Sequence, residues 1–110
     1  MKSVFITGAS SGIGESLAYY FAKQFYAIGI AARRKDRLKI VAKKITDYGG
    51  TPFIFELDVS NQKACQSVII QFLENIGKID IVIANAGIGG TDKLSSGNSK
   101  TINKITTVVY

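Results

Sequence analysis

Three glycines and two serines stand close together near the start of the chain, in the sequence TGASSGIG at residues 7–14. An apolar segment precedes this sequence and a helical pattern follows it. The first N–H groups of a helix lack partners inside the helix, and the aligned peptide dipoles add partial positive charge there. Glycine lets an anion approach such groups closely, so the spacing predicts a phosphate-binding turn. An ordinary glycine-rich turn is the alternative.

Each glycine of this turn has a predicted role. Gly8 can adopt the positive φ of a tight turn, Gly12 leaves room for a pyrophosphate, and Gly14 lets the helix pack closely on the strand. Ser10 and Ser11 can add hydroxyl donors. The spacing T-G-x-x-x-G-x-G is neither the G-x-G-x-x-G fingerprint nor the G-x-x-x-x-G-K-[ST] loop of nucleoside-triphosphate binders. Its position between a strand and a helix favours a dinucleotide site.

A basic cluster follows the second predicted strand, where Arg33 and Arg34 come directly after Ala32. NAD binders usually carry an acid about 20 residues past the glycine turn, which would repel a 2′-phosphate. Ala32 stands in that place here. A charge-assisted hydrogen bond contributes about 1.5 to 3 kcal/mol, so one arginine can favour NADP over NAD by about tenfold to a hundredfold. We predict NADP, with NAD less favoured; Arg34 and Arg37 could instead be solvated residues at a helix start.

The segments that must position these residues alternate between strands and helices. Apolar residues recur at three- and four-residue steps in the helical segments, and the almost unbroken apolar run at residues 79–84 is typical of a strand covered on both faces. Strands are predicted at residues 2–6, 27–33, 53–57 and 79–84, and helices at residues 13–25, 36–48 and 61–76, the last with Ser60 as its N-cap. We predict one α/β unit over residues 1–110, a Rossmann-type parallel sheet with helices on both faces.

The character of the sequence changes after the fourth predicted strand. Residues 88–100 are polar and rich in glycine, which predicts a loop that lines the active-site region. From Thr101 we predict the start of another helix, and the chain ends at Tyr110 without a cap. We therefore expect the fold to stop partway through this helix, which would leave the strand at 79–84 with an exposed apolar edge. Such a chain would be the amino-terminal part of a longer enzyme or the product of an interrupted gene.

Three motifs together resemble the short-chain dehydrogenase/reductase family. They are the glycine turn at residues 7–14, Leu57-Asp58-Val59 after the third strand, and Asn85-Ala86-Gly87 after the fourth. The resemblance implies a nicotinamide dinucleotide whose pyrophosphate lies at residues 8–14, Ile13 included. It also implies that Asp58 and Val59 lie near the adenine, and Asn85, Ala86 and Gly87 beside the adenosine ribose. Taken alone, Asp58 could be a helix cap or a turn residue, and Asn85 a turn former.

The resemblance also concerns the catalytic residues. Relatives use a serine, together with a tyrosine and a lysine four residues apart, in the part of the fold after the fourth strand. Tyr19 and Lys23 have this spacing, but they lie on the first predicted helix, and we interpret the match as coincidence. Asn103 is the nearest candidate for a further family asparagine, but its neighbours do not fit and its role is unassigned. We therefore assign no catalytic residue.

Two functions remain open at this point. The leading prediction is an NADP-dependent oxidoreductase that transfers hydride between the cofactor and a carbonyl or alcohol substrate, represented here by its cofactor-binding half. If the chain continues, relatives suggest a homo-oligomer. The alternative is a non-catalytic dinucleotide-binding module or an inactive fragment.

The amino-acid composition argues against several other classes of function. The chain has no histidine and one cysteine, Cys65, so it offers neither an ordinary zinc site nor an internal disulfide. We interpret Cys65 as a small buried residue. Apolar runs fall short of the roughly 18 residues that span a bilayer, and the first apolar segment is too short for a secretion signal, so we expect a cytoplasmic protein without a membrane partner. The net charge of +6 could attract nucleic acid, but the lysines are scattered and the main basic cluster suits one local anion.

Overall fold

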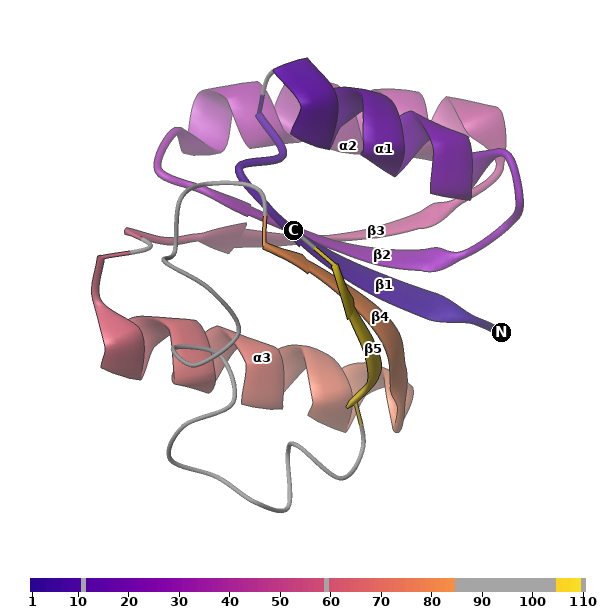
Figure 1. Ribbon diagram of the computed structural model, residues 1–110. Coiled ribbons are helices and arrows are strands. Elements are labelled where there is room, and N and C mark those ends of the chain that lie inside the picture. Colours follow the sequence, from indigo (N-terminus) through magenta and orange to yellow (C-terminus); the bar gives the residue numbers. More distant parts are fainter. Residues whose placement is uncertain (11, 59, 85–104, 110) are drawn as a thin grey trace.

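The computed structural model describes residues 1–10, 12–58, 60–84 and 105–109 (Figure 1). Five of the predicted site residues lie outside these ranges, namely Ser11, Val59, Asn85, Ala86 and Gly87. The predicted loop at residues 88–100 and Asn103 also lie outside them.

Strands and helices alternate as the sequence predicts, and the strands form one parallel sheet. In chain order the elements are β1 (Ser3–Thr7), α1 (Gly12–Ala22), β2 (Ala27–Ala32), α2 (Lys35–Tyr48), β3 (Thr51–Glu56), α3 (Gln62–Ile76), β4 (Ile79–Ala84) and β5 (Ile105–Val109). The sheet order is β3-β2-β1-β4-β5. Helices α1 and α2 cover one face and α3 covers the other (Figure 1). The predicted Rossmann-type fold is confirmed.

The last described strand corrects one prediction. A helix was expected from Thr101, but residues 105–109 form β5, which pairs in parallel with β4, with Ile79 opposite Ile105 and Ile83 opposite Val109. The segment reads ITTVV, and its five residues are all β-branched. Branching at Cβ lowers helix propensity and favours strands. The edge of β4 that was expected to be exposed is therefore paired.

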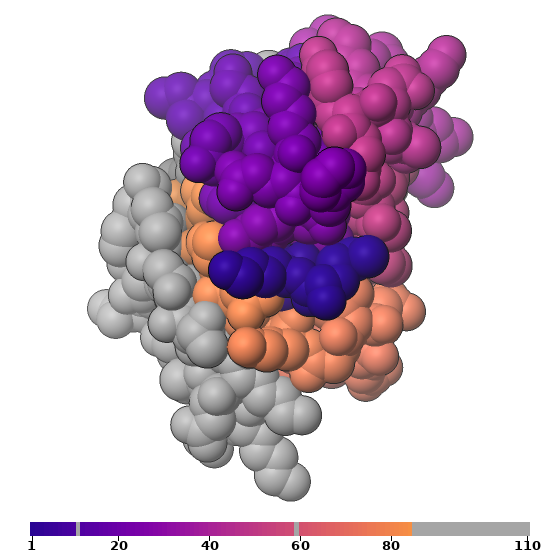
Figure 2. All heavy atoms as spheres, turned by 90° about the vertical axis from the view of Figure 1, so that its right-hand side faces the viewer, coloured from indigo at the N-terminus to yellow at the C-terminus, as the bar shows by residue number. Residues whose placement is uncertain are grey.

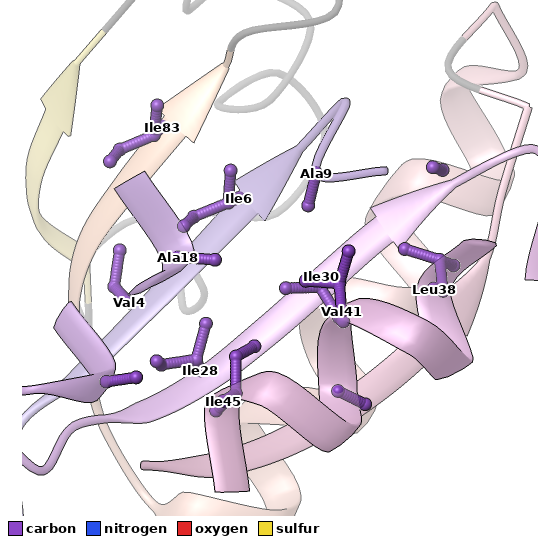
Figure 3. Packing of buried hydrophobic residues seen from close by; sticks show 13 residues of the cluster. Val4, Ile6, Ala9, Ala18, Ile28, Ile30, Leu38, Val41, Ile45 and Ile83 are labelled. Atoms are coloured by element: carbon purple, nitrogen blue, oxygen red, sulfur yellow. The ribbon is translucent and has the colours of Figure 1, made fainter. Parts of the chain in front are cut away.

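The core lies on both faces of the sheet because alternate residues of each strand point to opposite sides. From β1, Val4 and Ile6 pack with α1 and α2, in the cluster drawn in Figure 3, whereas Phe5 packs against the α3 side. All five residues of β1 are buried, as expected for a central strand of a parallel sheet. The first strand is thus fixed between two helical layers, which places the turn after it.

Helix α1 ends earlier than predicted. The periodicity suggested a helix as far as Phe25, but Phe25 has φ 65° and its side chain is 68% exposed. The N–H groups of Phe25 and Tyr26 donate to the carbonyls of Ala22 and Phe21, at 2.9 and 3.2 Å, and the rings of Phe21 and Tyr26 lie 4.9 Å apart. This is a Schellman ending with its usual hydrophobic contact. Phe25 takes the left-handed position that glycine normally holds.

At the amino ends of the strands, a polar cluster joins β1 to β4. Figure 2 looks onto this end of the molecule, where the first residues of the chain run between the two helical layers. The Ser3 N–H donates to Asp80 Oδ2 at 2.9 Å, and the Ser3 hydroxyl donates to the Lys78 carbonyl. Lys78 Nζ lies 3.1 Å from Asp80 Oδ1. The cluster ties together the two strands at which the order of the sheet reverses.

Asp80 gives this cluster a pH dependence. Burial disfavours its charge, but hydrogen bonds from Ser3 and Lys78 and the Lys78 charge outweigh burial and lower the pKa of Asp80 below its ordinary 3.8. A group whose pKa is lowered by folding stabilises the fold above its ordinary pKa, and this contribution is lost as the pH falls through the folded-state pKa.

We therefore expect Asp80→Asn to lower the free energy of unfolding at pH 7 by about 1 to 2 kcal/mol. The difference from the parent protein should shrink below pH 4, where the parent carboxyl also becomes neutral. Urea unfolding at several pH values measures both effects. Asp47→Asn, at an exposed position on α2, is the control. A deficit that is the same at every pH would show that the charge of Asp80 does not matter.

Candidate functional site

A cavity of about 450 Å³ opens at the carboxyl ends of β1, β2 and β3. Among the described residues, five predicted site residues line it: Gly8, Ser10, Arg33, Arg34 and Asp58. Ala32, Leu57 and Ser60 line it as well. Ligands of open α/β sheets bind at this end of the strands. The structure thus brings together residues that are up to 50 positions apart in the sequence.

A second cavity, of about 330 Å³, lies at the opposite end of the sheet. Met1, Ala27 and Thr51 contribute to its wall, and none of the predicted site residues lines it within the described part of the chain. Because it lies at the amino ends of β2 and β3, it is not where a parallel sheet usually binds a ligand.

The glycine turn has the backbone geometry of an anion cradle. Gly8 has φ 67°, as predicted, and its N–H donates to the Ala31 carbonyl at 2.8 Å. Gly12, the first residue of α1, has φ 61°, and a Cβ added there would lie more than 4 Å from every described residue beyond its chain neighbours. Gly14 is buried in the first turn of the helix. The opening of α1 is therefore accessible, and a diphosphate fits the chemistry of this turn.

At the end of β2, alanine stands where NAD binders carry an acid, and arginine follows it. Ala32 is 6% exposed and supplies no carboxylate, and the exposed Arg33 follows it at the cavity wall. Hydrogen bonds from Ser60 lower the pKa of Asp58, and the charge of Arg33 lowers it further. Arg33 and Asp58 therefore act on each other across the ends of β2 and β3. An anionic group at this wall would find a guanidinium next to it.

The side chain of Arg34 already forms an ion pair within the chain. Arg34 is the N-cap residue of α2, with φ −103° and ψ 99°, and its Nη2 lies 3.2 Å from Asp36 Oδ2. Both side chains are more than two-thirds exposed. Some desolvation raises the pKa of Asp36, but the hydrogen bond and the charge of Arg34 outweigh this effect, and the pKa is lowered below its ordinary value. Arg34 thus combines a place at the cavity wall with the helix-start role that was its alternative interpretation.

Asp58 forms a local turn at the end of β3. Its Oδ1 accepts hydrogen bonds from the Ser60 N–H at 3.0 Å and the Ser60 hydroxyl at 2.7 Å. The prediction that Ser60 caps α3 is wrong, because its hydroxyl is bonded to Asp58. Asn61 is the cap instead, and its Oδ1 accepts from the Ala64 N–H at 3.0 Å. The turn alternative for Asp58 is therefore realised, and the residue still lines the cavity.

One contact at the site was not predicted from the sequence. Arg37, in the first turn of α2, donates from Nη2 to the Ser10 carbonyl at 3.3 Å. Its place in the first turn of α2, three residues after the N-cap residue Arg34, was the available signal, because this turn follows β2, the strand beside β1 in the sheet, and the glycine turn follows β1. From the sequence, Arg37 is a member of the basic cluster or a solvated residue at the helix start, and neither interpretation predicts a bond to Ser10.

The Tyr19 and Lys23 pair is not arranged for proton transfer. The Tyr19 hydroxyl donates to Glu15 Oε2 at 2.7 Å, and Lys23 Nζ lies 4.9 Å from the centre of the Tyr48 ring. Burial and the hydrogen bond to Glu15 raise the pKa of Tyr19 well above its ordinary value. A general acid of this kind needs a pKa that is lowered towards neutrality. The interpretation of this spacing as coincidence is supported.

Other chemistry is not indicated in the described residues. Within residues 1–10, 12–58, 60–84 and 105–109 there is no group of three potential metal ligands. In the same ranges, each helix is too short or too polar to cross a membrane. Cys65 is buried on α3, as predicted, with 2% exposure.

Comparisons with known proteins find similar sequences among dehydrogenases and reductases. A family model described as short chain dehydrogenase matches residues 2–109. The 11-beta-hydroxysteroid dehydrogenase-like 2 of Arabidopsis thaliana is 47% identical over 91 residues, which are 82% of this chain and 30% of that protein. A fatty acyl-CoA reductase of Mycobacterium tuberculosis is 41% identical over 86 residues, covering 78% of this chain and 29% of that protein. The chain thus spans less than a third of the length of these curated relatives.

The chain is also similar to solved structures of dehydrogenases. A short-chain type dehydrogenase/reductase from Mycobacterium marinum superposes with a TM-score of 0.74 and 37% identity, over 79% of this chain and 35% of that one. An alcohol dehydrogenase from the archaeon Thermococcus sibiricus, complexed with 5-hydroxy-NADP, gives a TM-score of 0.75 and 36% identity. That match covers 94% of this chain and 44% of the other.

Proposed function

The chain belongs to the short-chain dehydrogenase family, and on that premise we propose that it supplies the cofactor site of an NADP-dependent oxidoreductase. The reaction is the transfer of hydride between NADP(H) and a small carbonyl or alcohol substrate. The observation that carries the choice of NADP is the end of β2, where Ala32 leaves no carboxylate and Arg33 stands at the cavity wall. A homo-oligomer is part of the same proposal.

In this proposal, different described residues bind different parts of the cofactor. The open turn at Gly8 and Gly12 and the start of α1 hold the diphosphate, since unpaired helix amides and the helix dipole attract anions. Arg33 holds the 2′-phosphate by a charge-assisted hydrogen bond. Asp58, which follows β3 and lines the same cavity, contacts the adenine in the proposed mode of binding. When bound, the cofactor supplies or accepts a hydride at its nicotinamide ring.

The similar structures support this proposal without extending it to a substrate. The archaeal alcohol dehydrogenase is described as complexed with 5-hydroxy-NADP, which is a cofactor of the class proposed here. The same comparison also includes a xylitol dehydrogenase described as NAD+-bound, at 26% identity. Proteins of this fold therefore bind either cofactor, and the residues at the end of β2 are expected to determine which one binds.

Titration of the protein with NADPH and NADH tests the proposal directly. We expect NADPH to bind at least about tenfold more tightly, because a single charge-assisted hydrogen bond to phosphate contributes about 1.5 kcal/mol or more. The change in cofactor fluorescence on binding measures both dissociation constants. Equal affinities would contradict the choice of NADP, and failure to bind either cofactor would contradict the dinucleotide site.

A second measurement separates the enzyme from the non-catalytic module. The oxidation of NADPH by a protein that carries both this chain and the catalytic segment expected after it is followed by absorbance in the presence of a panel of aldehydes and ketones. Turnover of any of these compounds supports the oxidoreductase. Tight NADPH binding without turnover across the panel would favour a binding module.

A further inference from the structure

A single side chain connects two separate parts of the proposed cofactor site. Arg37 lies in the first turn of α2, and its Nη2 donates to the carbonyl of Ser10, 3.3 Å away and 27 residues earlier in the chain. Ser10 is part of the glycine turn and lines the cavity. The contact therefore fixes the glycine turn to the helix that follows β2.

The contact lies where the turn leaves the support of the sheet. The N–H groups of Gly8 and Ala9 both donate to the Ala31 carbonyl, at 2.8 and 3.4 Å, and hold the beginning of the turn against β2. Ser10 comes next, two residues before Gly12 and the start of α1. A hydrogen bond to the Ser10 carbonyl limits the rotation of the peptide group that contains this carbonyl. The amides at the start of α1, which would face the proposed diphosphate, come shortly after it in the chain.

The surroundings of Arg37 differ from those of Arg33. In the described part of the chain, Arg33 and Arg34 line the cavity and Arg37 does not. The charge of Arg37 acts instead on Tyr19, whose hydroxyl is bonded to Glu15 in the first turn of α1. The guanidinium of Arg37 thus lies close to both the Ser10 carbonyl and helix α1.

We propose that Arg37 is a positioning residue, which holds the glycine turn in shape for the diphosphate through the Ser10 carbonyl. This inference rests on the proposed function, since it assigns a role within the same site. The diphosphate is common to NADP and NAD, so Arg37 affects both cofactors equally. Arg33, in contrast, contacts a phosphate that only NADP has. The two arginines should therefore be separable by ligands that carry one phosphate group or the other.

The test uses Arg37→Ala and Arg33→Ala with four ligands: NADPH, NADH, ADP and adenosine 2′-monophosphate. Loss of one hydrogen bond should weaken binding of NADPH, NADH and ADP to Arg37→Ala by a common factor of about three to ten. Binding of adenosine 2′-monophosphate to this variant should be unchanged. Arg33→Ala should show the opposite pattern, with weaker binding of NADPH and adenosine 2′-monophosphate only. Isothermal titration calorimetry measures all eight dissociation constants.

Two further variants control for charge and for folding. Arg37→Lys keeps a charged donor and should recover part of the lost ADP affinity, whereas Lys39→Ala removes a neighbouring exposed charge from α2 and should change nothing. Thermal unfolding of each variant ensures that binding is measured on folded protein. If Arg37→Lys folds and Arg37→Ala does not, the lysine variant alone should show the common loss of NADPH and NADH affinity.

The outcomes distinguish this inference from the proposed function. Failure of the parent protein to bind any of the four ligands would refute the proposed function itself. If the parent binds, an Arg37→Ala variant with unchanged ADP affinity would refute the positioning role. Loss of affinity for NADPH and adenosine 2′-monophosphate alone would also refute it, because Arg37 would then be a direct ligand of the 2′-phosphate.

Discussion

Replacing Arg33 with alanine is expected to weaken NADPH binding by about tenfold to a hundredfold and to leave NADH binding within about twofold of the parent value. Arg33 lies at the cavity wall directly after the end of β2, and Ala32 offers no carboxylate to the ribose. The guanidinium can hold a phosphate with two parallel N–H donors. NADH has no group at this place, so its affinity should not depend on Arg33. Fluorescence titrations with both cofactors measure the change.

Arg34→Ala is the matched control for this prediction. Arg34 is next in sequence and lines the same cavity, but its Nη2 is paired with Asp36 at 3.2 Å and its backbone caps α2. A phosphate would have to compete with Asp36 for this guanidinium, so we expect a smaller loss of NADPH affinity than in Arg33→Ala. An equal loss of NADPH and NADH affinity in Arg33→Ala would mean that Arg33 contacts the adenosine common to both. A larger effect in Arg34→Ala would reverse the assignment of the two arginines.

The fold follows from patterns that are local in the sequence. Apolar periodicity located four strands and three helices to within a few residues, and Gly49 and Gly77 mark helix ends, with φ 105° and 80°. The predictions failed where a particular contact decided between alternatives. Phe25 takes a left-handed conformation because Phe21 and Tyr26, which are close in sequence, close the end of α1 around it. The pairing of β5 with β4, in contrast, is a contact between distant segments.

The site was predictable only at the level of strand ends. Gly8, Arg33 and Asp58 follow three adjacent parallel strands, and the carboxyl ends of such strands meet at one edge of the sheet. Their convergence therefore follows from topology. Side-chain partners do not follow from topology, because a long side chain has several rotamers and several partners within reach. For this reason the contact between Arg37 and Ser10 became evident only from the structure.

The packing of α3 under the sheet depends on one aromatic ring. Phe72 is fully buried, and its ring centroid lies 5.8, 5.4 and 6.1 Å from those of Phe5, Phe53 and Phe55. Gly29 of β2 leaves the space for this arrangement, because a Cβ there would lie 2.8 Å from Phe5 and 3.2 Å from Phe72. The rings and the glycine thus form one packed unit, which attaches α3 to the three strands whose ends form the cavity.

Phe72→Ala should therefore lower the free energy of unfolding by about 3 to 5 kcal/mol, which is a large part of the total stability of an ordinary domain. Urea unfolding measures the change. Phe72→Leu keeps most of the buried volume and should lose less, and Tyr20→Ala, at a 60% exposed aromatic position on α1, should lose about 1 kcal/mol or less. A loss below about 1 kcal/mol in Phe72→Ala would contradict the packing of α3 against the sheet.

Because α3 begins two residues after Ser60 at the cavity wall, its loosening should also weaken cofactor binding, but equally for NADPH and NADH. That equal loss distinguishes a defect in packing from the loss of Arg33.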